Sequence, residues 1–196
     1  MNNTEDFIIR EAKPEDALVI SRVIQMAMHT EGCLALAGSE ERFPLLDKTF
    51  TILAARPDSQ YSYRNTIVAE DGGGTIAGAI VSYDGAFLHP LRRAFVEVAN
   101  EVLDSKFVEE EMDLETSDDE IYLDSLAVFP EYQGKGLAKR LIAAALERHA
   151  GSVKPFGLLC APGNNDAYRL YERLGFREIG LRPFAGILMH HMVHKG

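Results

Sequence analysis

Residues Val128–Ile142 have the sequence VFPEYQGKGLAKRLI, which joins two different patterns. An apolar run ends at Pro130, two glycines flank Lys135, and strong helix formers begin at Leu137. Glycine lets the backbone turn sharply and lets a ligand approach the main chain without a Cβ in the way. The first N–H groups of a helix lack acceptors inside it, and the helix dipole adds partial positive charge there. The segment therefore predicts a strand, a tight turn and a helix whose start can bind phosphate, best a pyrophosphate.

The predicted phosphate loop is short, and a purely structural role is its alternative. Its members are Gln133, Gly134, Lys135, Gly136, Leu137 and Ala138. Lys135 can add a positive charge at the rim of the loop. A glycine-rich turn that only opens a helix uses the same residue types, so the hexapeptide by itself does not decide between the two roles.

Length, charge and cysteine content exclude several classes of protein. With 196 residues we expect one domain, residues 1–196, large enough to bury a hydrophobic core. The net charge of −10 makes duplex nucleic acid and anionic membranes poor partners and suits a neutral or cationic small substrate. Neither a signal peptide nor a membrane span is expected from the apolar runs. Cys33 and Cys160 are expected to be reduced and buried in a cytoplasmic protein.

Hydrophobic periodicity predicts strands and helices along the rest of the chain. The predicted strands occupy residues 6–12, 120–128, 154–161 and 186–193, with a hairpin at 65–84. The predicted helices occupy residues 14–29, 40–56, 91–107, 136–150 and 164–175. This order combines a hairpin with strand–helix–strand units, so we expect a mixed sheet with helices on both faces.

A second segment, Asn164–Phe176, strengthens the phosphate interpretation. Together the two segments resemble the Gcn5-related N-acetyltransferase (GNAT) superfamily, from about Glu120 to Phe176. The pyrophosphate loop of that superfamily is Arg/Gln-x-x-Gly-x-Gly/Ala, and its three places are filled here by Gln133, Gly136 and Ala138. Its later helix carries Asn-x-x-Ala-x-x-x-Tyr and ends in Gly-Phe, matched here by Asn164, Ala167, Tyr171, Gly175 and Phe176. Two motifs at suitable spacing are far more specific than either alone.

The resemblance implies an α/β (α+β) fold with a mixed, mostly antiparallel central sheet of about seven strands flanked by helices. The sequence departs from the family pattern in one place. The strands near Ile80 and Tyr122 are usually joined by a short loop, yet here residues 85–119 lie between them. We expect this insert between strands 3 and 4 to be helical and to lie close to where acceptors enter. A substrate therefore cannot be inferred from a relative with a short loop.

The resemblance also implies a site for acetyl-CoA. In the family, strand 4 and the next strand splay apart, and backbone groups of strand 4 pair with the pantetheine arm in the gap. Here that role falls on Leu126, Ala127 and Val128, and the loop from Gln133 to Ala138 would hold the pyrophosphate. Asn164 is expected to bond the pantetheine, and Tyr171 to lie near the thioester sulfur. Asn164 as a helix cap and Tyr171 as a core residue are the structural alternatives, of which capping is compatible with cofactor contact.

Transfer to an amine sets three chemical requirements. A primary amine attacks a thioester only when neutral, but its pKa is about 10.4 in water, so a base or a desolvating site is needed. Glu120, Tyr122 and Asp124 are expected on one face of their strand. Asp124 is the first candidate base, directly or through a water; Glu120 is the second, and a chain of waters is the third. The Leu126 N–H is the candidate donor to the oxyanion, and Tyr171 the candidate acid for the leaving thiolate.

The expected function is an N-acetyltransferase that moves acetyl from acetyl-CoA to a primary amine of a small molecule or a protein, by direct attack in a ternary complex. A non-catalytic CoA-binding module and a transferase for a longer acyl group are the alternatives. The acids at 109–111 and 118–120 form a solvated surface or attract a cationic acceptor, such as a polyamine, an aminoglycoside or a protein lysine. Homodimers are common in the superfamily, and the sequence does not fix the oligomeric state.

No metal site and no covalent acetyl carrier are expected. His190 and His191 point to opposite faces of a strand, so regular geometry does not bring both to one ion. Cys160 occupies a buried strand position with no sign of an activated thiolate.

Overall fold

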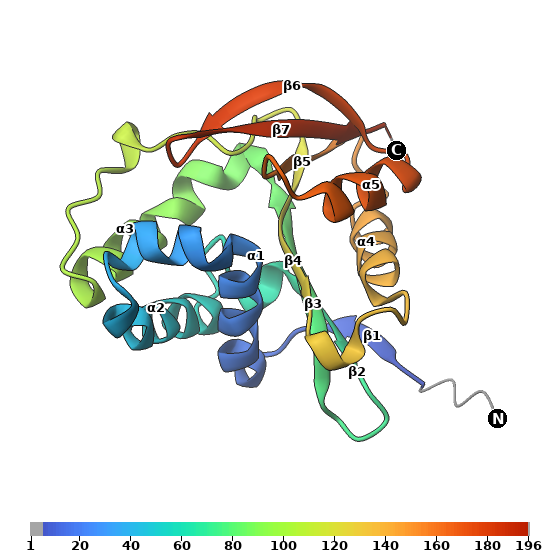
Figure 1. Cartoon of the computed structure of the whole chain (residues 1–196), viewed down its shortest axis with the longest axis horizontal. Coiled ribbons are helices and arrows are strands. Elements are labelled where there is room, and N and C mark those ends of the chain that lie inside the picture. Colours follow the sequence, from blue (N-terminus) through green and yellow to red (C-terminus); the bar gives the residue numbers. More distant parts are fainter. Residues whose placement is uncertain (1–5, 196) are drawn as a thin grey trace.

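A seven-stranded sheet forms the centre of the protein (Figure 1). The computed structural model describes residues 6–195. The strands are β1 (Ile8–Glu11), β2 (Thr66–Glu70), β3 (Ile76–Asp84), β4 (Ile121–Val128), β5 (Phe156–Cys160), β6 (Arg177–Phe184) and β7 (Ile187–His194). They lie in the order β1-β2-β3-β4-β5-β7-β6, and each neighbouring pair is antiparallel except β4 and β5. The expected mixed, mostly antiparallel sheet of about seven strands is confirmed.

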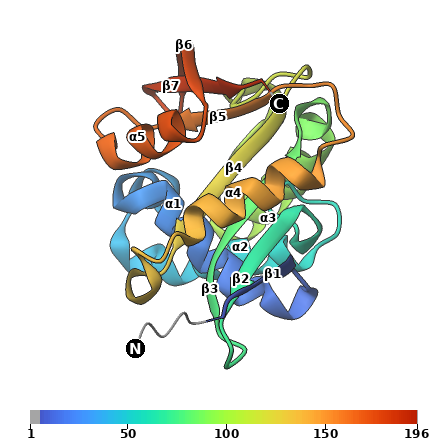
Figure 2. The same cartoon turned by 90° about the vertical axis from the view of Figure 1, so that its right-hand side faces the viewer.

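Helices cover both faces of this sheet. They are α1 (Ala17–Ala37), α2 (Phe43–Ala55), α3 (Leu88–Val102), α4 (Leu137–Arg148) and α5 (Asn165–Arg173). The first three pack on one face, and Figure 2 shows α4 lying across the other. Successive strand residues alternate between the two cores: Val81 packs with α1–α3 and Ile80 with α4. Among residues 6–195, no helix combines the length and the apolar character that a membrane crossing requires.

The strand β6 was not predicted by the periodicity, which indicated no strand between residues 176 and 185. Most of its side chains are exposed, and it includes Gly180 and Pro183, so it lacks the apolar alternation of a half-buried strand. It forms because a tight turn at Ala185 and Gly186, both at positive φ, returns the chain antiparallel onto β7. β6 is therefore held by the turn and by a single neighbouring strand at the edge of the sheet.

The insert between β3 and β4 contains a helix, as expected. This helix, α3, begins at Leu88 and ends at Val102, earlier than the predicted 91–107, and residues 103–120 return the chain to β4. The ring of Phe95 stacks on that of Phe50 of α2, with centroids 6.5 Å apart. The insert therefore shares one core with the first two helices.

The helix α1 is broken at His29, where the predicted first helix ends. The backbone there has φ 56° and ψ 174°, and the chain then resumes helical geometry up to Ala37. A non-glycine residue at positive φ costs on the order of 1 kcal/mol or more, so its surroundings must hold it in place. This break borders the cleft that contains the candidate site.

Candidate active site

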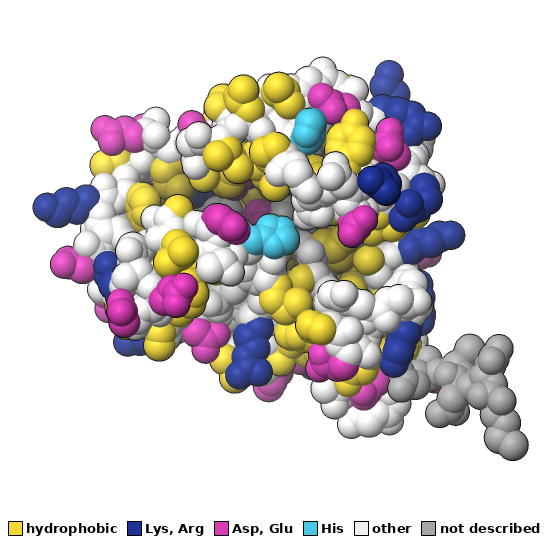
Figure 3. Space-filling view, viewed as in Figure 1, with side chains coloured by type: hydrophobic (Ala, Val, Ile, Leu, Met, Phe, Trp, Pro, Cys, Tyr) yellow, Lys and Arg dark blue, Asp and Glu magenta, His cyan; other side chains and the backbone are white. Residues whose placement is uncertain are grey.

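The strands β4 and β5 separate after two residue pairs and leave a gap in the sheet. The parallel register joins Ile121 to Phe156 and Tyr122 to Gly157, and the strands diverge beyond these pairs (Figure 2). A cleft of about 1150 Å³ opens there. Figure 3, in the orientation of Figure 1, shows a hollow near the centre of the molecule. The walls of the cleft come from α1, β4, the start of α4, β5 and α5. The structure thus has the gap that the resemblance implies.

A β-bulge places Asp124 in the wall of this cleft. Val81 and Ser82 are adjacent in β3, yet they pair with Ser125 and Leu123 of β4. Asp124 is therefore one residue more than β3 can pair, which is the definition of a bulge. Bulges bend a strand and redirect its side chains, and they are common next to active sites.

Beyond the bulge, one edge of β4 is open to the cleft. Leu126, Ala127 and Val128 line the cleft and remain paired with β3 on their other side. In a regular strand, Tyr122 and Leu126 would point to the same face of the sheet. Here Tyr122 packs with the α1–α3 core and Leu126 with the α4 core, because the bulge between them reverses the alternation. The side of β4 that faces β5 has no paired strand from Leu123 onward in the described residues. Its backbone groups can pair with an extended ligand instead.

The predicted phosphate loop leads directly into α4. Gly134 and Gly136 both have φ of 76°, and open space lies where a Cβ would stand at either position. Nε2 of Gln133 donates to the Val128 carbonyl at 3.0 Å, which ties the loop to β4. The loop residues that line the cleft are Gln133, Gly134, Gly136, Leu137 and Ala138. The start of α4 is therefore accessible from the cleft.

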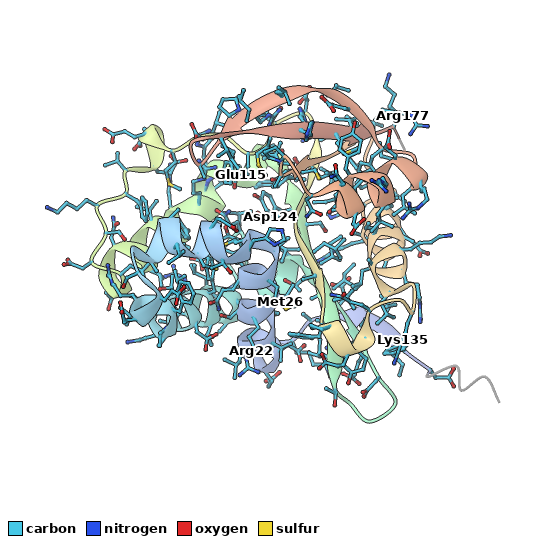
Figure 4. All side chains as sticks on the ribbon, in the orientation of Figure 1. Arg22, Met26, Glu115, Asp124, Lys135 and Arg177 are labelled. Atoms are coloured by element: carbon cyan, nitrogen blue, oxygen red, sulfur yellow. The ribbon has the colours of Figure 1, made fainter. Side chains whose placement is uncertain are left out.

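Lys135 is not among the residues that line the cleft. Its ammonium lies 5.3 Å from the centre of the Tyr132 ring and 5.6 Å from that of the Phe7 ring. Figure 4 shows Lys135 near the start of α4, apart from Asp124. Two other cations, Lys139 and Arg173, line the cleft. Lys139 stands in the first turn of α4, a signal that the sequence offered and that the prediction did not use.

Asn164 caps α5 and also contacts the break in α1. Its Oδ1 accepts a hydrogen bond from the Ala167 N–H at 3.3 Å. Its Nδ2 lies 3.4 Å from Nε2 of His29, so the two side chains meet across the cleft that both line. The sequence gives no signal for this contact, because it depends on the non-helical backbone at His29.

Tyr171 lines the cleft from α5, and its ring packs edge-on against Phe176 with centroids 5.9 Å apart. Burial, and next the nearby Cys160, raises the pKa of Tyr171 well above its usual value. The phenol therefore keeps its proton throughout the physiological range and can act as a donor.

The carboxyl of Asp124 accepts two hydrogen bonds. The Ser125 hydroxyl donates to Oδ1 at 2.7 Å, and the Tyr83 hydroxyl donates to Oδ2 at 3.1 Å. Burial, and next the Glu115 carboxylate, raises the pKa of Asp124 to about 7. A carboxyl with this pKa is partly ionised near neutral pH, which suits a general base.

Glu120, the second candidate base, belongs to a different cluster. It is 3% exposed and is not among the residues that line the cleft. Its carboxylate lies 2.9 Å from Nε2 of His191, accepts from the Thr116 hydroxyl at 2.8 Å, and lies 3.4 Å from Arg182. Burial opposes its ionisation, but the hydrogen bonds from His191 and Thr116 hold the pKa of Glu120 below its usual value. The geometry therefore favours Asp124 over Glu120 as a base.

The raised pKa of Asp124 makes the stability of the fold depend on pH. Between the unfolded pKa of about 3.9 and the folded pKa of about 7, the folded chain holds a proton that the unfolded chain has released. Wild-type stability therefore falls as pH rises through this window, and Asp124→Asn removes that loss. We expect the free energy of unfolding of Asp124→Asn, relative to wild type, to rise by on the order of 2 kcal/mol between pH 5 and pH 8 in urea denaturation. A difference that stays constant with pH would contradict the raised pKa.

The cysteines and histidines have the placements expected of them. Cys33 and Cys160 are free and buried. Burial raises the pKa of Cys160 to about 11, so this residue stays a thiol and not the thiolate that an acetyl carrier needs. His190 contacts Glu178, whereas His191 contacts Glu120. Within residues 6–195, no group of three or more His, Cys, Asp or Glu side chains is placed to hold a metal ion.

Solved structures of acetyltransferases share the fold of this chain. An N-acetyltransferase from Staphylococcus aureus Mu50 gives a TM-score of 0.77 at 24% identity, with 95% of this chain and 99% of that one covered. A second acetyltransferase gives 0.75 at 25% identity, with 96% and 98% covered. The NatC complex bound to Gag peptide and CoA gives 0.57 at 15% identity, with 97% and 99% covered. No curated protein matches the sequence.

The sequence places the chain in one family of acetyltransferases. The model of the Acetyltransferase (GNAT) family matches residues 30–176. This chain belongs to that family, and the resemblance seen in the two motifs is confirmed. The family uses acetyl-CoA as its acyl donor, so the cleft between β4 and β5 has a candidate ligand.

Proposed function

We propose that this chain is an N-acetyltransferase that moves the acetyl group of acetyl-CoA to a primary amine of a small molecule or a protein, by direct attack in a ternary complex. The observation that carries the proposal is that Asp124, with a pKa of about 7, and the protonated phenol of Tyr171 line one cleft. Their surroundings keep the pKa values of the two groups far apart, so Asp124 can accept a proton while Tyr171 donates one. We also propose that residues 1–196 act as one domain, in the cytoplasm, where free cysteines stay reduced.

The phosphates of acetyl-CoA are assigned to the start of α4. Gly134 and Gly136 leave the loop amides open, and the dipole of α4 favours an anion there. Lys139 and Arg173 line the same cleft and supply positive charge for phosphate oxygens. This role falls to them more than to Lys135, whose ammonium lies over two aromatic rings.

The pantetheine arm is assigned to the gap between the strands. The open edge of β4 at Leu126–Val128 supplies backbone donors and acceptors to an extended amide chain. Nδ2 of Asn164 is the donor that we assign to a carbonyl of the arm, since Oδ1 is already used in the cap of α5. The NatC complex, which shares the fold, was solved with CoA bound.

The chemistry follows from these positions. Asp124 takes a proton from the acceptor ammonium, directly or through a water, and the neutral nitrogen attacks the thioester carbon. The carbonyl oxygen gains negative charge, which the Leu126 N–H stabilises. The C–S bond then breaks, and the thiolate of CoA takes the proton of Tyr171. The attacking nitrogen loses its second proton to solvent as the amide forms, and the proton on Asp124 returns to the Tyr171 phenolate through solvent, which restores both groups.

The raised pKa of Tyr171 limits when it can act. In water a phenol and a thiol differ by about 1.5 pKa units. Burial widens that difference for Tyr171, but the thiolate that forms in the same cleft is desolvated too, which raises its own pKa. Tyr171 therefore transfers its proton as the C–S bond breaks and not before.

A cationic amine fits the acceptor side of the cleft. Glu31 of α1 and Asp124 of β4 both line this cleft, and the whole chain carries a net charge of −10. Like-signed charges along a cleft raise the local concentration of an oppositely charged substrate. We therefore propose a polyamine, an aminoglycoside or a lysine side chain as the acceptor.

An amine panel with acetyl-CoA tests the proposal. Polyamines, aminoglycosides and lysine peptides are each incubated with the chain, while CoA thiol release and the mass of the acceptor are measured. We expect amine-dependent thiol release matched by acetylated product, with kcat/KM about 100-fold lower in Asp124→Asn at neutral pH. Calorimetric binding of acetyl-CoA without release on any amine would favour a non-catalytic CoA-binding module. Faster release from propionyl- or succinyl-CoA would favour transfer of a longer acyl group.

A further inference from the structure

Behind Asp124, a second carboxylate shares the same tyrosine hydroxyl. The hydroxyl of Tyr83 lies 3.1 Å from Oδ2 of Asp124 and 3.3 Å from Oε1 of Glu115. Burial raises the pKa of Tyr83 well above its usual value, so the hydroxyl keeps its proton. A phenol has a single proton and can donate it to only one acceptor at a time. The two carboxylates therefore compete for one donor.

Glu115 comes from the insert in which this chain departs from the family pattern. It lies in the segment between α3 and β4, is 3% exposed and is not among the residues that line the cleft. It forms an ion pair with Arg92 of α3, which is 1% exposed, and accepts a hydrogen bond from Nε2 of Gln60 at 3.1 Å. Figure 4 shows Glu115 and Asp124 near each other, between α3 and β4.

This buried cluster is not explained by stability. An ion pair removed from water adds little net stability, because both partners lose their hydration. Within the described residues, Nη1 of Arg92 and Oε1 of Gln60 also have no hydrogen-bond partner, and an unsatisfied buried polar group destabilises a fold. Buried polar groups that do not stabilise the fold are expected at functional sites.

We propose that Glu115 is a positioning residue for Asp124: through the Tyr83 hydroxyl that they share, it lets Asp124 alternate between its ionised and protonated forms without losing a hydrogen bond. The inference rests on the proposed function, in which Asp124 takes a proton from the acceptor amine.

Rotation of one hydroxyl is enough for this role. While Asp124 is ionised, Tyr83 donates to it. Once Asp124 holds the proton of the amine, its own O–H can donate to the Tyr83 oxygen, and the Tyr83 proton turns to Glu115. Burial raises the pKa of Glu115, but the guanidinium of Arg92 counters this and favours the ionised acceptor. No proton leaves the cluster during this rotation, and the negative charge of Glu115 makes Asp124 a stronger base.

Other groups around Asp124 do not duplicate this arrangement. Tyr122 of β4 is buried and Tyr61, which follows α2, is half-buried; desolvation and then the Asp124 carboxylate raise the pKa values of both. His29 and Cys33 of α1 and Tyr171 of α5 line the cleft in front of Asp124. Gln60 lies near both carboxylates, but its amide donates to Glu115 at 3.1 Å. Among the described residues, the Tyr83 hydroxyl lies within 3.3 Å of both carboxylates.

Two substitutions with opposite expected effects test the proposal. Glu115→Gln removes the nearby negative charge. The acidic limb of the kcat/KM profile should therefore shift to lower pH, by about one pH unit. Tyr83→Phe removes the hydrogen bond to ionised Asp124. The same limb should therefore shift to higher pH, by about half a pH unit. The matched control is Glu110→Gln, an exposed residue of the same segment, which should leave the profile unchanged. A purely structural role would lower activity without moving the limb, and that result would overturn the proposal, as would shifts in the same direction.

A measurement independent of turnover separates this inference from the proposed function. The 13C resonance of the Asp124 carboxyl, assigned with Asp124→Asn, gives its pKa directly in wild type, Glu115→Gln and Tyr83→Phe. The same opposite shifts are expected, and their absence refutes the role of Glu115. Full activity of Asp124→Asn would instead refute Asp124 as the base, whatever the titration shows. If Glu115→Gln alone does not fold, adding Arg92→Met removes the unpaired charge, and the downward shift should persist.

Discussion

Tyr171→Phe should lower the turnover of acetyl-CoA about 100- to 10,000-fold, the range over which general acids contribute to catalysis. The phenol lines the cleft beside Cys160, and burial keeps it protonated, so the substitution removes a proton donor and little else. The phenylalanine ring can keep the edge-on contact with Phe176. The affinity for acetyl-CoA, measured by calorimetry, should therefore stay within a few fold of wild type. The separation of turnover from affinity is the signature of an interaction made only in the transition state.

Tyr168→Phe provides the matched control for this result. Tyr168 lies on the same helix, α5, but its hydroxyl donates to Glu178 at 2.9 Å. Its loss should leave turnover nearly unchanged. Equal turnover of Tyr171→Phe and wild type would remove Tyr171 from the mechanism and leave the thiolate to be protonated by water.

Gly136→Glu should abolish measurable binding of acetyl-CoA, a loss of at least about 100-fold in affinity. Three effects act together at this position. The φ of 76° suits glycine, the side chain would occupy the open space above the loop, and its negative charge would repel the pyrophosphate at the start of α4. Isothermal titration with acetyl-CoA measures the loss, and far-UV circular dichroism checks that the chain still folds.

The contribution of backbone strain can be separated from that of the site. Gly186, in the turn between β6 and β7, has φ of 80° and equally open space at its Cβ position. Gly186→Glu therefore introduces the same residue with similar strain away from the phosphate loop. It should bind acetyl-CoA as wild type does. Loss of binding in both variants would mean that strain, and not occupation of the phosphate site, explains the effect of Gly136→Glu.

The fold was predictable where residue pattern and local chemistry agree. Two β-rich runs around a glycine-rich turn identified the hairpin of β2 and β3, helical spacing identified α1 and α3, and strong helix formers identified α4. β6 could not be found in this way, because exposed edge strands are held by a turn and a neighbour and not by burial. The continuation of α1 beyond His29 was also missed, since a break at positive φ has no sequence signature in a histidine.

Linear motifs predicted most of the candidate site, and strand position added Asp124 as a candidate base. The loop from Gln133 to Ala138 and the helix beginning at Asn165 follow such motifs, and both border the cleft. The bulge at Asp124 depends on the register between two strands distant in sequence, which one sequence does not report. Glu115 has no distinguishing signal in the sequence, because its burial and its contact with Tyr83 depend on how the insert packs.

The surplus residue in β4 has a consequence for how this protein can be altered. Without Asp124, Leu123 and Ser125 would become neighbours opposite Ser82 and Val81, and the ladder with β3 would run without interruption. The scaffold therefore does not need the very position on which the chemistry is proposed to depend. We therefore expect deletion of Asp124 to give a chain that folds but has lost transferase activity, because the fold and the proposed chemistry depend on different residues of β4.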